Sequence, residues 1–206
     1  TPCGTLFPYT TLFRSVVAGN VTSSEATKAL IEAGADGIKV GQGPGSICTT
    51  RIVTGSGRAQ LSAVYDCAKA AGGIPVIADG GIKYSGDIVK AFAAGANCVM
   101  VGSLFASCTE APGETVKIGG VDYRVYRGMG SIEAMKKWEG SRERYGQNDG
   151  EANKMVAEGV EGKVLIKGPF SFVFGQLIGG VQSGLGNSGA SDIEDLQKKA
   201  CFRKIS

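Results

Sequence analysis

The chain of 206 residues contains no histidine. Histidine carries the proton in Cys–His and Ser–His catalytic sites and is the commonest zinc ligand, so these sites are excluded in their usual form. The six cysteines include no Cys-x-x-Cys pair, which also argues against structural zinc. We expect a reduced, cytoplasmic protein in which Cys67 and Cys98, both in apolar segments, are small buried core residues.

The sequence also has no apolar run near the roughly 20 residues that a membrane span requires, and no convincing signal peptide. Its net charge is only +3, and the basic residues are scattered along the chain. A membrane or a specific nucleic-acid partner is therefore not expected. The length suits one domain, but it is short of the about 250 residues of a complete eight-unit α/β barrel.

Glycine, by contrast, is abundant, with 33 of 206 residues placed mainly at strand ends and in loops. The most informative stretch is GQGPGSICTT, residues 41–50, which we call the cysteine loop. Because glycine lets the backbone approach a ligand closely, such a loop can wrap a phosphate or a cation. Cys48 is a candidate nucleophile, activated by backbone amides and a local positive field. The alternative is a buried structural thiol.

The first residues differ from the rest of the chain. PYTTLFRS, residues 8–15, resembles the translation of a common sequencing adapter. We therefore expect residues 1–14 to be a non-native segment that precedes one domain at residues 15–206. An ordinary variable N-terminus is the alternative.

From Ser15 onward, short apolar strands alternate with helices. The predicted elements are strands at 16–20, 37–40, 74–78 and 98–101, and helices at 22–33, 58–71 and 85–94. Thr22 and Ser85 are the expected N-caps of two of these helices. Strands this apolar indicate an α/β fold with a parallel sheet covered on both faces. The phrase EAGADGIKVG at 32–41 recurs as AAGANCVMVG at 93–102, as in a barrel of repeated βα units.

Polar residues and glycines collect where the predicted strands end, which is where parallel α/β folds bind ligands. Asp79 could accept hydrogen bonds from sugar hydroxyls, or it could be a solvated turn residue. Gly81, Gly102 and Ser103 could donate to a phosphate, or they could serve turn geometry alone. The strand ends therefore predict a nucleotide-like ligand without deciding these roles.

The second half of the chain has a different pattern. Residues 114–126 predict a β-hairpin, residues 139–161 are polar and predict a mobile flap, and closing helices are predicted at 172–181 and 191–200. Within the flap, Arg144 and Tyr145 are either a solvated surface pair or groups that activate water. Arginine is a poor base because its pKa lies above about 12. No separate second domain is predicted.

Several motifs together resemble the IMP dehydrogenase family. They are VVAGNVTSSEATKALIEAGAD (16–36), GQGPGSICTTR (41–51), IADGGIKYSGDIVKA (77–91), GSLFASCTEAPGE (102–114) and YRGMGS (126–131). The match covers nearly all of residues 16–200. The resemblance implies a partial TIM (β/α)8 barrel: the last four βα units, an active-site flap at about 131–165, and the C-terminal helices.

The resemblance also implies a reaction, the NAD-dependent oxidation of IMP to xanthosine monophosphate in guanine nucleotide biosynthesis. Cys48 would attack the purine C2, hydride would pass to NAD, and water would release the product once the flap moves in. Thr50 would assist proton transfer, and Arg144 beside Tyr145 would activate the water.

The resemblance assigns binding roles to further residues by their motif positions. Asp79 and Gly80 would contact the ribose side of the substrate. Phosphate ligands would be Ser46, Gly81, Gly102, Ser103 and Tyr126, and the hypoxanthine base would face Gly128, Met129, Gly130 and Glu158. The NAD side would include Asn20, Gly41 and Gly43, and a potassium ion would be held by the backbone carbonyls of Gly43, Gly45 and Cys48.

The chain departs from the family pattern in ways that bear on activity. It matches only the last four of eight barrel units, it lacks the paired CBS modules and the usual C-terminal tail, and Gly146 stands where the family has an aromatic residue. We expect a fragment of an enzyme that is a homotetramer at full length. We expect little or no turnover from the fragment alone.

Three other interpretations stay open. The sister family, GMP reductase, has a similar cysteine loop and barrel but lacks the Arg–Tyr pair of the flap. A flavin-binding barrel has similar phosphate loops but does not need Cys48. A non-catalytic half-barrel would bind nucleotide, or would merely associate with its missing half through open sheet edges and uncovered apolar surface.

Overall fold

The computed structural model describes residues 15–145 and 156–204, without the side chains of Glu139, Glu143 and Arg144. Residues 1–14 lie outside this range, so their non-native origin stays a prediction. The elements of the first half are β1 (Val17–Val21), α1 (Ser24–Glu32), β2 (Gly37–Val40), α2 (Thr50–Val53), α3 (Gln60–Ala70), β3 (Val76–Asp79), α4 (Ser85–Ala93), β4 (Cys98–Met100) and α5 (Ser103–Ala106).

The four predicted strands form one parallel sheet in the order β1-β2-β3-β4, so the predicted βα alternation is confirmed. The helix caps differ from the prediction. Ser23, not Thr22, caps α1 by accepting a hydrogen bond from the amide of Ala26. At α4 the N-cap is Tyr84, and the carboxylate of Asp87 accepts hydrogen bonds from the backbone there. The N-cap is the residue just before the first one with helical dihedral angles, and the spacing of residues in the sequence alone does not decide its position.

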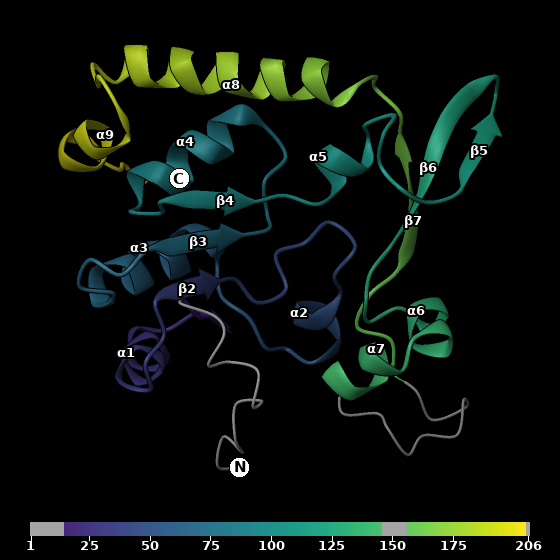
Figure 1. Ribbon diagram of the computed structural model, residues 1–206, viewed down its shortest axis with the longest axis horizontal. Coiled ribbons are helices and arrows are strands. Elements are labelled where there is room, and N and C mark those ends of the chain that lie inside the picture. The colour runs from purple at the N-terminus through teal and green to yellow at the C-terminus, as the bar shows by residue number, and fades with distance from the viewer. Residues whose placement is uncertain (1–14, 146–155, 205–206) are drawn as a thin grey trace.

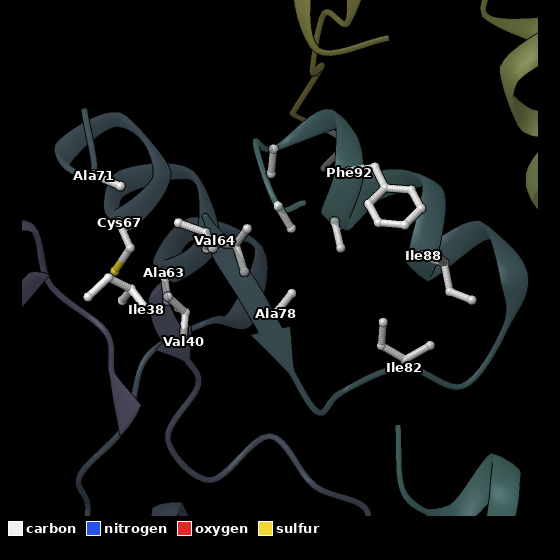
Figure 2. Packing of buried hydrophobic residues seen from close by; sticks show 14 of the residues in the cluster. Ile38, Val40, Ala63, Val64, Cys67, Ala71, Ala78, Ile82, Ile88 and Phe92 are labelled. Carbon is white, nitrogen blue, oxygen red and sulfur yellow. The ribbon is translucent and has the colours of Figure 1, made fainter. Parts of the chain in front are cut away.

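One face of the sheet carries the core of the domain. Side chains that alternate along the strands, such as Ile38, Val40 and Ala78, are buried against helices α1, α3 and α4. Figure 2 shows these residues packed with Val64 and Phe92 of the covering helices. Burial of such apolar side chains is the main stabilising contribution to this layer.

The opposite face of the sheet is open, so the prediction of cover on both faces is wrong for the described residues. Val17 is 56% exposed and Met100 is 50% exposed. Cys98, predicted to be buried, is exposed for the same reason, whereas Cys67 is buried in α3 as predicted. The apolar strands do contribute to the hydrophobic core through one face, but no described segment covers their second face.

The second half begins with a three-stranded antiparallel sheet. Strands β5 (Thr115–Ile118) and β6 (Val121–Arg127) form the predicted hairpin. Strand β7 (Glu161–Leu165) pairs with β6, which the sequence did not predict. Helices α6 (Ile132–Lys137) and α7 (Glu139–Arg144) lie between β6 and β7. Figure 1 shows this sheet beyond the arrowhead ends of β2, β3 and β4.

Two closing helices complete the chain. Helix α8 (Phe170–Asn187) is longer than the predicted 172–181, and α9 (Ile193–Lys199) agrees with the prediction. Figure 1 shows α8 running alongside α4. Gly180 and Gly184 of α8 allow this close approach, because a side chain there would collide with Ser85 or Val89. None of the helices in the described ranges is long and apolar enough to cross a membrane.

Two glycines of α8 predict opposite effects of the same substitution. At Gly179 a Cβ would meet nothing within 4 Å, so Gly179→Ala should raise the free energy of unfolding by about 0.5–1 kcal/mol. At Gly184 it would lie 2.5 Å from a methyl of the stiff Val89 side chain, so Gly184→Ala should lower it by about 1–3 kcal/mol. Urea unfolding measures both; equal shifts would contradict the close packing of α8 on α4.

Candidate active site

The cysteine loop leaves the end of β2 and returns through the short helix α2. Cys48 is partly exposed, and its Sγ lies 3.2 Å from the hydroxyl oxygen of Thr50. The thiol also lies 3.7 Å from the carbonyl oxygen of Glu158, to which it can donate. The sulfur of the predicted nucleophile is thus next to the hydroxyl predicted to assist it.

Residues 158–160 hold the cysteine loop in place. On one side this segment makes hydrogen bonds of 2.9 Å with the backbone of Ile47 and of Thr49. On its other side it makes hydrogen bonds of 3.0 Å with the backbone of Gly128 and of Gly130. Three stretches that are far apart in sequence therefore form one backbone-linked platform under the nucleophile.

Asp79, at the end of β3, is the centre of a polar cluster. Its Oδ2 accepts hydrogen bonds from Lys39 Nζ at 2.7 Å and from Asn20 Nδ2 at 2.9 Å. Asn20 Nδ2 also donates to the carbonyl of Gly41 at 2.7 Å. Both bonds to the carboxylate reach the same oxygen, and no described residue donates to Oδ1. Asp79 is therefore fixed in position while one oxygen stays free for a ligand.

A cavity of about 510 Å³ opens beside Cys48. It brings together many of the predicted site residues, namely Asn20, Gly41, Gly43, Gly45, Cys48, Thr50, Asp79, Gly80, Tyr145 and Glu158. Gln42 and Pro44 complete its described lining. The nucleophile, the carboxylate and the predicted cofactor-side residues thus face one space.

A narrower cavity of about 40 Å³ adjoins the first and shares Pro44, Gly45 and Gly80 with it. Its lining contains all of the predicted phosphate ligands, namely Ser46, Gly81, Gly102, Ser103 and Tyr126. Lys83 also lines it, which adds a positive charge that suits a phosphate. The size and lining fit one small anionic group rather than a ring.

Tyr126 is held close to the backbone of this narrow cavity. Its hydroxyl occupies the place that a Cβ on Gly102 would take, so a larger residue there would require the Tyr126 ring to move. Burial raises the pKa of the Tyr126 phenol, and the negative charge of Asp79 raises it further. The hydroxyl therefore stays protonated at neutral pH and can donate a hydrogen bond to an anion.

Gly128, Met129 and Gly130 were also predicted to face the substrate, but they lie apart from the lining of these two cavities. Gly128 and Gly130 belong to the backbone platform, and the Met129 side chain is 53% exposed. The ring of Tyr145 packs against Gly130, where a Cβ would come within 2.7 Å of it. Arg144 ends α7, but its side chain lies outside the described residues, so its role stays a prediction.

The carbonyls predicted to bind potassium differ in their availability. Gly45 already accepts a hydrogen bond from the Cys48 amide at 3.1 Å, whereas no described backbone amide donates to the carbonyls of Gly43 and Cys48. A carbonyl oxygen has two lone pairs, so each of the three carbonyls keeps at least one that could bind a potassium ion. No group of three or more acidic or cysteine side chains in the described ranges could hold a metal.

Two charged residues of the site were missed in the sequence. Lys39 is the only charged residue of an apolar strand whose neighbouring positions are buried. A charged residue at such a position indicates a polar partner at the site. Lys83 closely follows Gly80-Gly81 at the end of a strand. A basic residue at that position could have indicated an anion-binding side chain. Both residues could be noticed in the sequence, but the sequence does not show toward which face of the sheet or which cavity each side chain would point.

Residues 9–206 match the family model of the IMP dehydrogenase / GMP reductase domain. The chain belongs to this family. It is 58% identical over 193 residues to inosine-5'-monophosphate dehydrogenase of Aquifex aeolicus. The aligned region covers 93% of this chain and 39% of that protein. It is 55% identical over 196 residues to the Streptococcus pyogenes protein of the same name, covering 94% and 39%. The chain thus spans about two fifths of the length of these curated relatives.

The fold is similar to that of a cysteine-to-alanine variant of GMP reductase from Trypanosoma brucei in complex with guanosine 5'-monophosphate. The TM-score is 0.83 at 45% identity, and the match covers 93% of this chain and 38% of that chain. The predicted family and the predicted partial α/β barrel are therefore both confirmed.

The Lys39–Asp79 pair should be energetically coupled, because both side chains are largely buried, at 28% and 22% exposure. A double-mutant cycle of Lys39→Met and Asp79→Asn should give a coupling near about 1 kcal/mol in urea unfolding. The exposed Lys117–Asp122 pair, at 3.6 Å, is the matched control and should couple by less than about 0.3 kcal/mol. Equal couplings would argue against a fixed Asp79.

Proposed function

We propose that the chain carries the nucleophile and the substrate site of an IMP dehydrogenase, which oxidises IMP to xanthosine monophosphate with NAD as hydride acceptor. One observation supports this most: the cavity beside Cys48 continues into the narrow, hydroxyl-lined and lysine-lined cavity at Gly81. The first has room for a base and a sugar, and the second suits the phosphate of the same nucleotide.

Binding of the nucleotide follows from the two cavities. The free Oδ1 of Asp79 would accept a hydrogen bond from a ribose hydroxyl, while Lys39 and Asn20 hold Oδ2. The hydroxyls of Ser46, Ser103 and Tyr126, the amides of Gly81 and Gly102, and Lys83 would surround the phosphate. Charge-assisted hydrogen bonds of this kind orient the base over the cysteine loop.

Cys48 would then perform covalent catalysis. Its sulfur adds to the purine C2, hydride leaves C2 for the nicotinamide of NAD, and a thioimidate linked to Cys48 is formed. The hydroxyl oxygen of Thr50, at 3.2 Å from the sulfur, can accept a hydrogen bond from the Cys48 thiol. The hydroxyl can then donate its own proton to a further acceptor. Water adds to C2 in the second stage, the C–S bond breaks, and the thiol is regenerated with xanthosine monophosphate released.

The remaining roles are also proposals. NAD, when bound, accepts the hydride; Asn20, Gly41 and Gly43 lie on the side of the cavity where it would be held. A potassium ion held by the carbonyls of Gly43, Gly45 and Cys48 would keep the cysteine loop in one shape. Arg144, with Tyr145, would activate the water, which requires an environment that lowers the arginine pKa.

We also propose that turnover requires more than these 206 residues. In the described part of the chain, one face of the sheet is open and β1 and β4 are edge strands. Completion of the barrel would pair those edges and cover that face, in a cytoplasmic homotetramer. The chain alone is therefore expected to bind nucleotide weakly at best.

GMP reductase is the second candidate function, favoured by the similarity to the solved Trypanosoma brucei structure. That reaction would consume GMP and NADPH and release ammonia, and it needs no water-activating pair. The two candidates are separated by offering both substrate pairs to the full-length protein. Formation of NADH from IMP supports the dehydrogenase, and release of ammonia from GMP supports the reductase.

Covalent labelling tests the role of Cys48. The thiolate should add to C2 of 6-chloro-IMP, with loss of the C2 proton, protonation of C6 and departure of chloride from C6, and intact mass should show one nucleotide adduct on the full-length protein. Cys48→Ala should abolish both the adduct and NADH formation, whereas Cys98→Ala, which removes another exposed thiol, should keep the adduct. The 206-residue chain should be labelled more slowly and produce little or no NADH. An adduct that survives Cys48→Ala would contradict the proposal.

The hydrolysis stage can be tested separately. Arg144→Ala in the full-length protein should leave the first burst of NADH intact but slow later turnover by about 100-fold, a typical cost of losing an acid–base group. The covalent intermediate should then accumulate and be visible by mass. Arg142→Ala, on the same helix, is the control and should behave as wild type. An unchanged hydrolysis rate in Arg144→Ala would remove it from the base role.

A further inference from the structure

Gln60 is the first residue of α3 and is absent from the lining of both cavities at the site. Its side-chain Nε2 donates to the carbonyl of Val40 at 2.9 Å and to the carbonyl of Asp79 at 3.2 Å. Val40 ends β2, directly before the cysteine loop, and Asp79 ends β3, directly before the turn to Gly81. One amide group therefore ties together the two points from which the ligand-binding loops leave the sheet.

The body of the Gln60 side chain also fills the space between these loops. A Cβ on Gly41, whose φ is +144°, would lie 2.9 Å from Nε2 and 3.1 Å from Oε1 of Gln60. A Cβ on Gly81 would lie 3.6 Å from the Gln60 Cγ and 3.3 Å from Pro44 of the cysteine loop. Gln60 and Pro44 thus both pack close to the turn at Gly81.

Stability alone does not account for a glutamine at this position. Its Oε1 is buried and accepts no hydrogen bond from any residue in the described ranges. A buried, unpaired acceptor costs about 1–3 kcal/mol, so an apolar side chain of the same size would be the simpler way to fill the space. What only the amide provides is a link to two carbonyls at once.

We propose that Gln60 is a positioning residue that sets the separation between Cys48 and the ribose-phosphate site. The inference rests on the proposed function, because it assumes one nucleotide that spans both loops. Gln60 touches neither the nucleophile nor the cavities, so it acts through the ends of β2 and β3. Its loss should misplace the sulfur relative to a bound purine without changing the reactivity of the thiol itself.

The test compares two reactions of Cys48 in the full-length protein. The first is labelling by saturating 6-chloro-IMP. In this reaction the sulfur adds to C2, the C2 hydrogen is lost as a proton, C6 gains a proton and chloride leaves C6, so the rate depends on the position of the nucleotide. The second is alkylation by iodoacetamide, in which the same sulfur displaces iodide and no nucleotide is needed. Only a positioning role changes the ratio of the two rate constants.

Gln60→Met keeps the size of the side chain and removes both hydrogen bonds. We expect it to lower the rate constant of 6-chloro-IMP labelling by at least about tenfold, since an error near 1 Å in the placement of reacting groups costs about that much or more. Iodoacetamide alkylation should stay within about twofold, the spread expected of a thiol in an unchanged environment. Gln60→Asn, which retains the amide on a shorter stem, should lie between Gln60→Met and wild type.

Gln197→Met is the matched control. Gln197 also donates from its side-chain amide to one carbonyl, that of Ala96 at 3.0 Å, and it is likewise part-buried. That bond lies before β4, at the end of the sheet away from both cavities. Gln197→Met should leave both rate constants at the wild-type level even where it lowers stability by the loss of its hydrogen bond.

Several results would overturn the inference. Equal slowing of both reactions in Gln60→Met would indicate a disordered loop and a purely structural role, and no change in either would indicate no role. Where Gln60→Met does not fold, Gln60→Asn decides on the same ratio, and an unchanged ratio rejects the inference. A wild-type protein that iodoacetamide alkylates at Cys48 but 6-chloro-IMP does not label would remove the proposed function, and the inference with it.

Discussion

The backbone hydrogen bonds between residues 158–160 and the cysteine loop are the constraint on which the site depends. The loop itself contains little regular structure, and its amides and carbonyls need partners. Ile47 and Thr49 find them in a segment more than a hundred residues later, which is bound on its other side to Gly128 and Gly130. Cys48, the proposed nucleophile, and residues 158–160 at the end of the predicted flap are therefore linked by backbone hydrogen bonds, so that neither segment can move far without breaking them.

A second set of contacts fixes the positions of the charged side chains near the cysteine loop. Asn20, Lys39 and Asp79 come from three neighbouring strands and meet at one carboxylate oxygen, so the register of the sheet fixes the carboxylate that is proposed to accept a hydrogen bond from the ribose. The cavity proposed for the phosphate is built differently, from hydroxyls, a lysine and Tyr126, whose hydroxyl lies against the backbone of Gly102. Gln60 sits between these two parts and touches the backbone of both.

Much of this was predictable from local sequence, and the failures have specific causes. The strands, the cysteine loop and the ligand-binding edge follow from patterns that act over a few residues. Strand β7 was missed because EGKVL alternates weakly and gains its pairing only from β6, which lies far away in the chain. Cys98 was misjudged because an apolar neighbourhood predicts burial only when a second layer covers it. Lys39 was passed over because its direction depends on strand register.

By itself the sequence determined the α/β class and the family and singled out Cys48 as the candidate nucleophile, since periodicity, glycine placement and motif order are properties of short segments. The tertiary structure alone decided which carboxylate oxygen is left free at Asp79, that Lys39 pairs with the other oxygen while Lys83 lines the narrow cavity, and that Gln60 links two strand ends. The physical reason is distance along the chain: each of these contacts joins different segments, and only the packing of the sheet and its helices brings them within a hydrogen bond of each other.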